Sequence, residues 1–272
     1  MGTEFRTIRL ERVEDGIDRL TLDRPDRLNA MNHQLVADLH AALEVVRGDR
    51  TTRVLVLTGA GRAFCAGLDL REGASPPDAD PARHRIPAGL DVQQHIATLI
   101  PQLRSLRVPV IAAVNGAATG GGLALALGSD IRIAAESARF GVAFVRIGLS
   151  GCDIGVSWLL PRLIGASRAH ELMLTGRIID AAEADRVGLV TRVVPDDGLV
   201  SAALDVAREI RANSPFGIWM TKEAMWSSLE IASQQAAIDL ENRQQILASM
   251  TPDMAEAVAA FLERRPANYG PA

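Results

Sequence analysis

Apolar and polar residues alternate with a period of two near the start of the chain, and the period then changes. Residues 7–13 and 17–22 alternate as expected of a half-buried β-hairpin. Residues 33–48 carry apolar side chains at helical spacing, which predicts an amphipathic helix that Asn32 is suited to cap. The apolar positions of this helix are Leu35, Leu39, Leu43 and Val46.

The two patterns recur through the first two thirds of the chain. Apolar runs predict buried strands over 53–58, 109–114 and 130–135. The segment 88–104 and a predicted helix over 121–128 lie between these strands, so the chain follows a repeated β-β-α rhythm. This rhythm places the protein in the α/β class.

The pattern changes near residue 198, where alanine-rich helical segments begin to follow one another. Pro215 and Pro252 mark the breaks between three expected helices. The expected helices cover 199–213, 215–249 and 252–264. We therefore predict a core over residues 1–197 and a C-terminal helical region over residues 198–272. Because these helices would bury little surface alone, we expect them to pack on neighbouring subunits.

Composition excludes several classes of function. The net charge is −4, so no basic excess favours nucleic-acid binding. No apolar run approaches the roughly 20 residues that a membrane helix needs. Cys65 and Cys152 are the only cysteines, which argues against a disulfide framework and favours a cytoplasmic location. Lys222 is the only lysine, so a phosphate-binding site would have to use arginine.

Two glycine-containing stretches carry the main indication of chemistry. Residues 64–70 follow the apolar run 54–59, and residues 115–122 follow the apolar run 110–114. In each, a strand gives way to glycines and a helical segment follows, which presents free backbone N–H groups at the positive end of a helix dipole. Two such groups that face one point would hold an oxygen that gains negative charge during a reaction.

Together with three further segments in the same order, these stretches resemble the crotonase superfamily, also called the enoyl-CoA hydratase/isomerase family. The further segments are 24–32, 160–165 and 174–190. The resemblance implies a crotonase-like spiral of ββα units, with C-terminal helices that assemble a homotrimer or hexamer. It also implies an acyl-CoA or enoyl-CoA substrate, as in fatty acid metabolism. Coenzyme A would enter as part of the substrate, with no metal or redox cofactor.

Carried across to this sequence, the resemblance implies an oxyanion hole formed by the N–H groups of Leu68 and Gly121. The residues expected to line the substrate and coenzyme channel are Arg27, Ala30, Ala66, Gly67, Asp69, Leu70, Gly120 and Phe144. Arg27 is expected near a coenzyme phosphate. Asp69 is expected mainly to tie its own turn together.

The chain departs from hydratases of this family at the two positions of their catalytic glutamates. Ala124 occupies the first position and Phe144 the second, and neither side chain can transfer a proton. One acid remains close by, Asp153, at a position that resembles the aspartate of dienoyl-CoA isomerases and aryl-CoA dehalogenases. Alternatively, Asp153 caps the helix expected to begin near Gly155. Glu72 is the reserve candidate for the acid.

Three functions follow from these residues. The first is a lyase or isomerase of the enoyl-CoA hydratase/isomerase type with Asp153 as its only acid or base. The second is other CoA-thioester chemistry, such as double-bond isomerisation or an unusual hydrolysis. The third is an acyl-CoA-binding protein that kept the oxyanion turns without catalysis. His84 and His95 lie where they could touch substrate without being catalytic.

Overall fold

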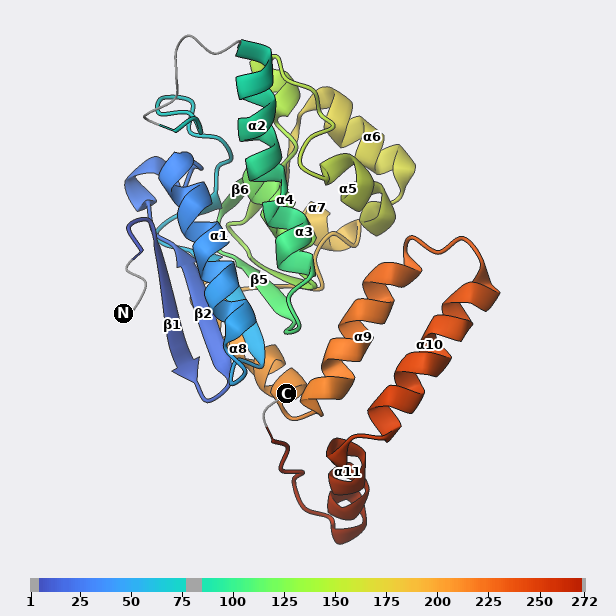
Figure 1. Ribbon diagram of the computed structural model, residues 1–272. Helices are drawn as coiled ribbons and strands as arrows, with labels where there is room; N and C mark the ends of the chain where they lie inside the picture. Colours follow the sequence, from blue (N-terminus) through green and yellow to red (C-terminus); the bar gives the residue numbers. More distant parts are fainter. Residues whose placement is uncertain (1–4, 77–84, 271–272) are drawn as a thin grey trace.

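Two β-sheets form the frame of the molecule (Figure 1). The computed structural model describes residues 5–76 and 85–270. Within these residues, the first sheet has the strand order β1-β2-β3-β5-β7-β10; β1 and β2 are antiparallel and the other neighbours are parallel. Its strands are β1 (Ile8–Glu14), β2 (Ile17–Leu22), β3 (Val54–Gly59), β5 (Val110–Val114), β7 (Ile131–Ala135) and β10 (Arg192–Val194).

The second sheet consists of short strands in the order β4-β6-β8-β9. These strands are β4 (Ala63–Cys65), β6 (Ala117–Thr119), β8 (Arg139–Gly141) and β9 (Ile178–Asp180). The strands β4, β6 and β8 follow β3, β5 and β7 along the chain and run parallel to one another, whereas β9 is antiparallel to β8. A long strand, a short strand of the other sheet and a helical segment therefore form the repeating unit, which confirms the predicted α/β spiral.

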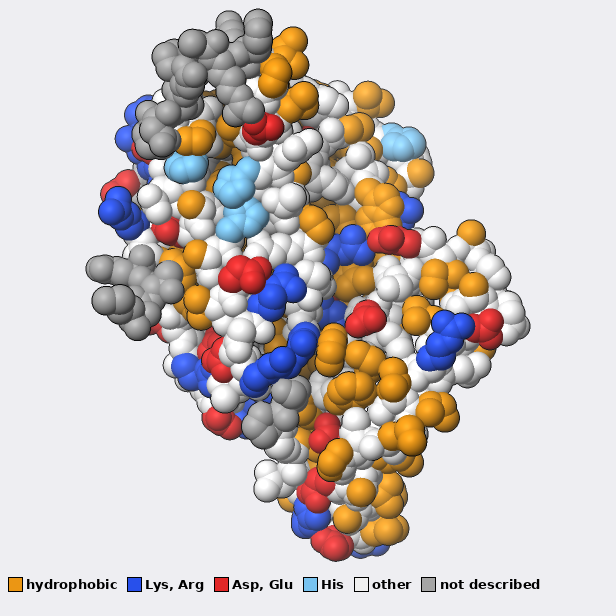
Figure 2. All heavy atoms as spheres, in the orientation of Figure 1, with side chains coloured by type: hydrophobic (Ala, Val, Ile, Leu, Met, Phe, Trp, Pro, Cys, Tyr) orange, Lys and Arg blue, Asp and Glu red, His pale blue; other side chains and the backbone are white. Residues whose placement is uncertain are grey.

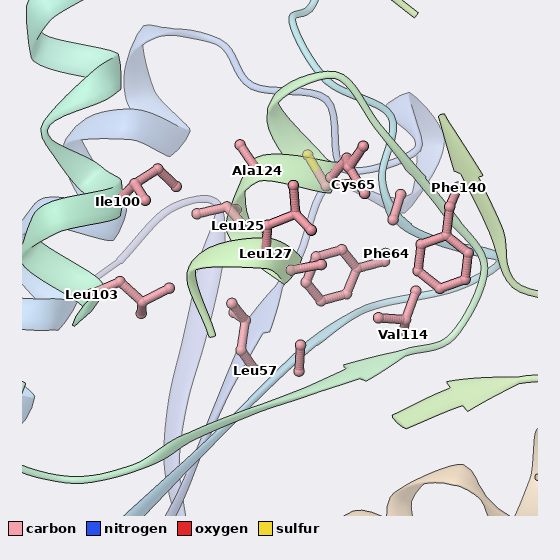
Figure 3. Packing of buried hydrophobic residues seen from close by; sticks show 14 of the residues in the cluster. Leu57, Phe64, Cys65, Ile100, Leu103, Val114, Ala124, Leu125, Leu127 and Phe140 are labelled. Carbon is pink, nitrogen blue, oxygen red and sulfur yellow. The ribbon is translucent and has the colours of Figure 1, made fainter. Parts of the chain in front are cut away.

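The larger apolar core joins one face of the first sheet to the second sheet. It includes side chains of α1 (His33–Gly48), α3 (Leu99–Arg104) and α4 (Gly121–Gly128). All residues of α4 are buried because the helix is apolar on every side. Figure 3 shows leucines of α4 among Phe64, Ile100 and Leu103. This burial fixes the start of α4, which is one of the two glycine turns.

A second apolar cluster covers the opposite face of the first sheet, where α8 (Leu199–Arg211) packs on β3, β5 and β7. The division at residue 197 stays a prediction, and α8 itself packs on the core sheet. The remaining helices of the body are α2 (Arg85–Ala97), α5 (Val156–Ile164), α6 (Ala166–Thr175) and α7 (Ala181–Arg186). Among the described residues, no helix is both long and apolar enough to span a membrane.

Three helices stand away from the body at the C-terminal end (Figure 1). They are α9 (Pro215–Ser228), α10 (Gln234–Ser249) and α11 (Pro252–Glu263). The prediction of one helix over 215–249 is wrong, because α9 ends at Ser228 and α10 begins only after Ser233. The Ser233 hydroxyl caps the new helix by accepting a hydrogen bond from the Ala236 N–H. The other predicted strands and helices agree with the structure to within two residues at each end, although 88–104 is divided between α2 and α3.

Lys222 fastens α9 to the body. Its Nζ lies 2.9 Å from Asp130 Oδ2, and only 3% of either side chain is exposed. The Trp226 Nε1–H donates to Asp130 Oδ1 at 2.6 Å, and Lys222 also donates to the Val108 carbonyl at 2.9 Å. Burial lowers the pKa of Lys222, against the opposing attraction of Asp130. The bonds give each buried polar group a partner, so α9 is held in one position on the body.

Candidate active site

Three parallel strands of the second sheet lead to the predicted site residues. Leu68 follows β4, Gly121 follows β6 and Phe144 follows β8. Because β4 pairs with β6 and β6 pairs with β8 in parallel, their carboxyl ends lie at one edge of the sheet. The strand order therefore brings together residues that are more than 70 positions apart in the sequence.

The backbone N–H of Leu68 is left available by a bridge to Met31. The Met31 N–H donates to the Gly67 carbonyl at 2.7 Å, and the Asp69 N–H donates to the Met31 carbonyl at 2.9 Å. In a parallel pairing of this kind, the N–H between the two bonded groups points to the other side. Within residues 5–76 and 85–270, nothing accepts a hydrogen bond from the Leu68 N–H.

The N–H of Gly121 is the first of helix α4 and likewise has no acceptor among the described residues. It lies at the positive end of the helix dipole. A Cβ placed on Gly67 would lie 3.5 Å from Gly121 N and 2.9 Å from the Thr119 carbonyl oxygen, so the two turns touch. Gly67 also has a φ of +91°, which favours glycine. The fold thus places two free N–H donors side by side.

These turns form one wall of a pocket of about 150 Å³. Most residues predicted for the site line this pocket, namely Ala66, Gly67, Leu68, Leu70, Gly120, Gly121, Phe144 and Asp153. Its other lining residues were not predicted, and they are Met31, Gln93, Ile96, Ala143, Ile147, Leu149 and Ile154. Among these described lining residues, Asp153 is the only one with an ionisable side chain.

Asp153 Oδ1 accepts two hydrogen bonds. One comes from the Ile154 N–H at 2.8 Å and the other from Gln93 Nε2 at 2.5 Å. The alternative that Asp153 caps a helix is not observed, because α5 has Gly155 as its N-cap and no side chain bonds to its first turn. The half-buried carboxylate instead faces the pocket together with the two free N–H groups.

The two positions of the absent glutamates have different surroundings. Phe144 lies in the pocket wall, and its ring comes within 3.3 Å of where a Cβ of Gly120 would be. Ala124 is completely buried in the second turn of α4 and does not line the pocket. Neither position offers a group that could move a proton.

A family model described as "Enoyl-CoA hydratase/isomerase" matches residues 12–271. The chain belongs to the enoyl-CoA hydratase/isomerase family. The family resemblance and the α/β crotonase fold predicted from the sequence are both confirmed.

Similar members of the family carry different reaction names. The chain is 43% identical over 257 residues to "Probable enoyl-CoA hydratase EchA12" of Mycobacterium tuberculosis, covering 94% of this chain and 90% of that protein. It is 42% identical over 256 residues to the 1,2-epoxyphenylacetyl-CoA isomerase of Escherichia coli, covering 94% and 95%. A crystal structure of an enoyl-CoA hydratase from Bacillus anthracis superimposes with a TM-score of 0.89 at 34% identity, covering 97% and 99%.

Three residues expected in the coenzyme channel of this family lie outside the pocket. Arg27 is exposed at the end of a short 3₁₀ helix, and Ala30 is buried. Asp69 is also buried and accepts hydrogen bonds from the N–H groups of Arg71 and Glu72 at 3.0 and 3.2 Å, as predicted for a residue that ties its own turn. Burial would raise the pKa of Asp69, but these N–H groups and nearby Arg24 hold it below its ordinary value.

The reserve acid, Glu72, does not line the pocket of this family member. Its carboxylate pairs with Arg24 at 2.9 Å and accepts a hydrogen bond from the Asn32 amide at 2.6 Å. These bonds join the turn after the first glycine stretch to the start of α1. The carboxylate of Glu72 therefore holds this turn in place, and Asp153 is the only carboxylate among the described residues that line the pocket.

His95 faces α1 and does not line the pocket. Its ring stacks on His40 at 4.4 Å between centroids, and the His40 Nε2 is 2.9 Å from the His95 carbonyl oxygen. Burial, followed by the charges of His40 and His33, lowers the pKa of His95. Figure 2 shows histidine side chains gathered on this face. His84 lies outside the described residues.

Sequence reasoning missed Gln93 in particular. The residue lies on α2, 60 positions before its hydrogen-bond partner Asp153, and no local motif surrounds it. Met31 was within reach of prediction, because it lies in the matched segment 24–32 and its sulfur is next to the Cα of Gly121. Only the fold shows that these two side chains share a pocket.

Proposed function

We propose that this protein moves the double bond of an enoyl-CoA thioester, with Asp153 as its single acid and base. The observation that carries the proposal is the composition of the pocket. Two free N–H groups lie beside one carboxylate, and no other described lining residue has an ionisable side chain. A solved structure that is 43% identical over 86% of this chain is described as a monofunctional enoyl-CoA isomerase from M. smegmatis, and this name supports the same assignment.

The N–H groups of Leu68 and Gly121 serve as the oxyanion hole. Removal of a proton from a carbon conjugated to a thioester moves an electron pair onto the carbonyl oxygen. Fixed backbone donors stabilise this negative charge without titrating, and the dipole of α4 adds to the effect at Gly121. Each such donor contributes about 3 kcal/mol to lowering a barrier of this kind.

A single carboxylate suits isomerisation better than hydration. Asp153 takes a proton from the carbon on one side of the double bond, and the electron pair spreads to the thioester oxygen. The same proton then returns from Asp153 to the carbon at the other end of the conjugated system. Hydration would also need a group that activates water, and Ala124 and Phe144 occupy the positions where hydratases of this family place theirs.

The coenzyme part of the substrate requires cationic contacts for its phosphates. Lys222, the only lysine, is buried in its pair with Asp130 and cannot supply them. Arginines therefore remain, and we keep Arg27, which is exposed, as the proposed phosphate contact. Ala30 stays a proposed part of the channel through its backbone.

We also propose a homotrimer or hexamer formed through the C-terminal helices. Large apolar side chains of α10, of α11 and of Met250 between them are exposed in the single chain, and many apolar side chains gather on the lower part of the molecule in Figure 2. These side chains are Ile246, Leu247, Met250, Met254, Val258, Phe261 and Leu262. A cytoplasmic location stays a prediction from the two cysteines.

The test compares two reactions and two variants. We expect the wild type to convert a 3-enoyl-CoA to the 2-enoyl-CoA much faster than it hydrates crotonyl-CoA. Asp153→Asn keeps the size of the side chain but removes its titrating group, so isomerisation should fall by about 10²–10⁴-fold. Binding of acyl-CoA by this variant should stay within about threefold of the wild type, because an acid and base acts on the chemical step.

Glu72→Gln is the matched control, since it neutralises a carboxylate near the site that does not line the pocket. Full isomerase activity in Asp153→Asn would show that the acid lies elsewhere. Rapid hydration of crotonyl-CoA by the wild type would contradict the isomerase assignment. Tight binding of acyl-CoA without turnover of any enoyl-CoA would instead favour a non-catalytic binding protein.

A further inference from the structure

Gln93 is the only residue of α2 besides Ile96 that lines the described pocket. Its amide nitrogen donates a hydrogen bond to Asp153 Oδ1 at 2.5 Å. The Ile154 N–H donates to the same oxygen at 2.8 Å. Both donors therefore act on one oxygen of the carboxylate, and among the described residues nothing donates to Oδ2. The two carboxylate oxygens are thus in different environments.

The backbone beside Asp153 supports a fixed orientation of this carboxylate. Ile154 has a φ of +36°, a left-handed conformation that is costly for a β-branched residue. The conformation is held by the bond from the Ile154 N–H to Asp153 and by the burial of the Ile154 side chain. Because a strained turn on one side and a side-chain amide on the other converge on Oδ1, rotation of the carboxylate would break both bonds.

We infer that Gln93 is a positioning residue that holds the Asp153 carboxylate so that Oδ2, and not Oδ1, exchanges the proton with the substrate. The inference rests on the proposed function and deepens it. In the first half of the reaction, a C–H bond of the substrate breaks and an O–H bond forms at Oδ2. The electron pair of the broken bond moves onto the thioester oxygen. In the second half, the same proton leaves Oδ2 for the other carbon.

A neutral amide suits this role. It donates to the carboxylate without adding a charge that would pair with it permanently, so Asp153 can pass between its two protonation states. The helix that carries Gln93 is tied to α1 through His40, whose Nε2 is bonded to the carbonyl of His95. The position of the amide is therefore set by the packing of α2 and not by Asp153 alone.

The test uses Gln93→Leu, which keeps the bulk of the side chain and removes the donor. Gln94→Leu is the matched control, because Gln94 is the neighbouring residue on the same helix and is exposed like Gln93, but does not line the pocket. For isomerisation by Gln93→Leu, we expect kcat to fall by about tenfold with KM within about twofold, since the acid is misplaced but substrate contacts remain. The midpoint of the acidic limb of the pH–rate profile should rise by about 0.5–1 pH unit, because the charged carboxylate loses a donor.

A second measurement does not depend on turnover. The carboxyl ¹³C signal of Asp153, assigned by its disappearance in Asp153→Asn, should titrate at higher pH in Gln93→Leu than in Gln94→Leu. In the double variant Gln93→Leu/Asp153→Asn, activity should be no lower than in Asp153→Asn, because Gln93 acts through Asp153.

The outcomes separate this inference from the proposed function. If Asp153→Asn is inactive while Gln93→Leu matches Gln94→Leu in kcat, pH profile and ¹³C titration, the inference is overturned and the isomerase proposal stands. If the wild type turns over no enoyl-CoA, the proposed function fails and the inferred proton exchange fails with it. A ¹³C shift confined to Gln93→Leu would then still show that Gln93 holds the carboxylate.

Discussion

Most large apolar side chains in the body of the protein are buried, whereas many of those in the C-terminal helices are exposed. In the body, Phe64 and Phe140 are completely buried between the two sheets. Met250, at the C-terminal end of α10, is 80% exposed, and Phe261 of α11 is 83% exposed. A single chain therefore buries most of the large apolar side chains of the body, whereas α10 and α11 leave many of theirs in contact with solvent.

The polar groups and the cavities show the same difference. The only buried residue of α10 is Gln244, and its amide nitrogen has no partner among the described residues. A cavity of about 740 Å³ lies between α9, α10 and α11 and is lined in part by Met220, Met225 and Met254. It is larger than the pocket that holds Asp153, yet it contains none of the predicted site residues. The comparison teaches that cavity size marks incomplete packing here, and that side-chain chemistry marks the site.

The largest expected effect is a loss of stability in the body of the protein. A Cβ on Gly122 would lie 1.9 Å from the carbonyl oxygen of Cys65, and a backbone atom in the core cannot move away cheaply. We therefore expect Gly122→Ala to lower the free energy of unfolding by about 3 kcal/mol. Denaturant unfolding followed by circular dichroism measures this loss.

Gly48→Ala is the matched control for that substitution. Gly48 ends α1, and no atom lies within 4 Å of the place where its Cβ would be. Alanine should raise stability there by about 0.5 kcal/mol through a less flexible unfolded chain. Equal stability of the two variants would contradict the close contact between α4 and β4.

The next prediction concerns the C-terminal helices. Because their apolar side chains need a second surface, light scattering at micromolar concentration should give a multiple of the 29.1 kDa chain mass. A charge at the centre of this surface, in Met250→Glu/Phe261→Glu, should shift the mass toward that of one chain.

Leu174→Glu supplies the comparison, since Leu174 is equally exposed but lies on α6 in the body. A wild-type mass of 29.1 kDa, which is the mass of one chain, would contradict the proposed oligomer. Dissociation by Leu174→Glu alone would place the interface on the body.

The smallest expected effect is a pH dependence of stability that arises inside the body, at the contact between α1 and α2. The pKa of His95 is lowered from its ordinary value of 6.5, so the unfolded chain takes up this proton more readily than the folded protein does. Stability should therefore decrease as the pH falls through 6.5, and the loss should be complete only below the lowered pKa.

His95→Gln should remove this part of the pH dependence, as measured by thermal unfolding between about pH 5 and 8. His170→Gln, at an exposed position of α6, controls for the loss of one histidine. If the pH dependence of stability is unchanged in His95→Gln, protonation of His95 does not destabilise the stacked rings of His40 and His95.

Local patterns were sufficient to predict most of the strands and helices, whereas their spiral arrangement came from the family resemblance. The periodicity predicted α1 at its observed ends, and the order of strands and helices predicted α4 at its observed ends. The glycine turns indicated only that free N–H groups would be present, and the family resemblance supplied Leu68 and Gly121 as the two donors. The break between α9 and α10 was missed because Ser233 is an ordinary polar residue until its hydroxyl caps a helix.

The site could be predicted only where a motif carries it. Asp153 was proposed through its resemblance to the aspartate position of dienoyl-CoA isomerases, but its partner Gln93 comes from another part of the chain and contacts it only through tertiary packing. Ala30 and Asp69 belong to matched segments, yet their side chains are buried outside the pocket. A motif therefore indicates a backbone path, and the packing decides which side chains of that path reach the substrate.

The ion pair between Lys222 and Asp130 allows the attachment of α9 to the body to be measured by a chemical reaction. Because Lys222 is the only lysine and is almost entirely enclosed, an amine-acylating reagent or a protease specific for lysine can reach it only when α9 leaves the body. The modified fraction at this one residue thus counts openings of the helix directly, with no probe introduced into the chain. Lys222 therefore reports on the contact between α9 and the body without an added label.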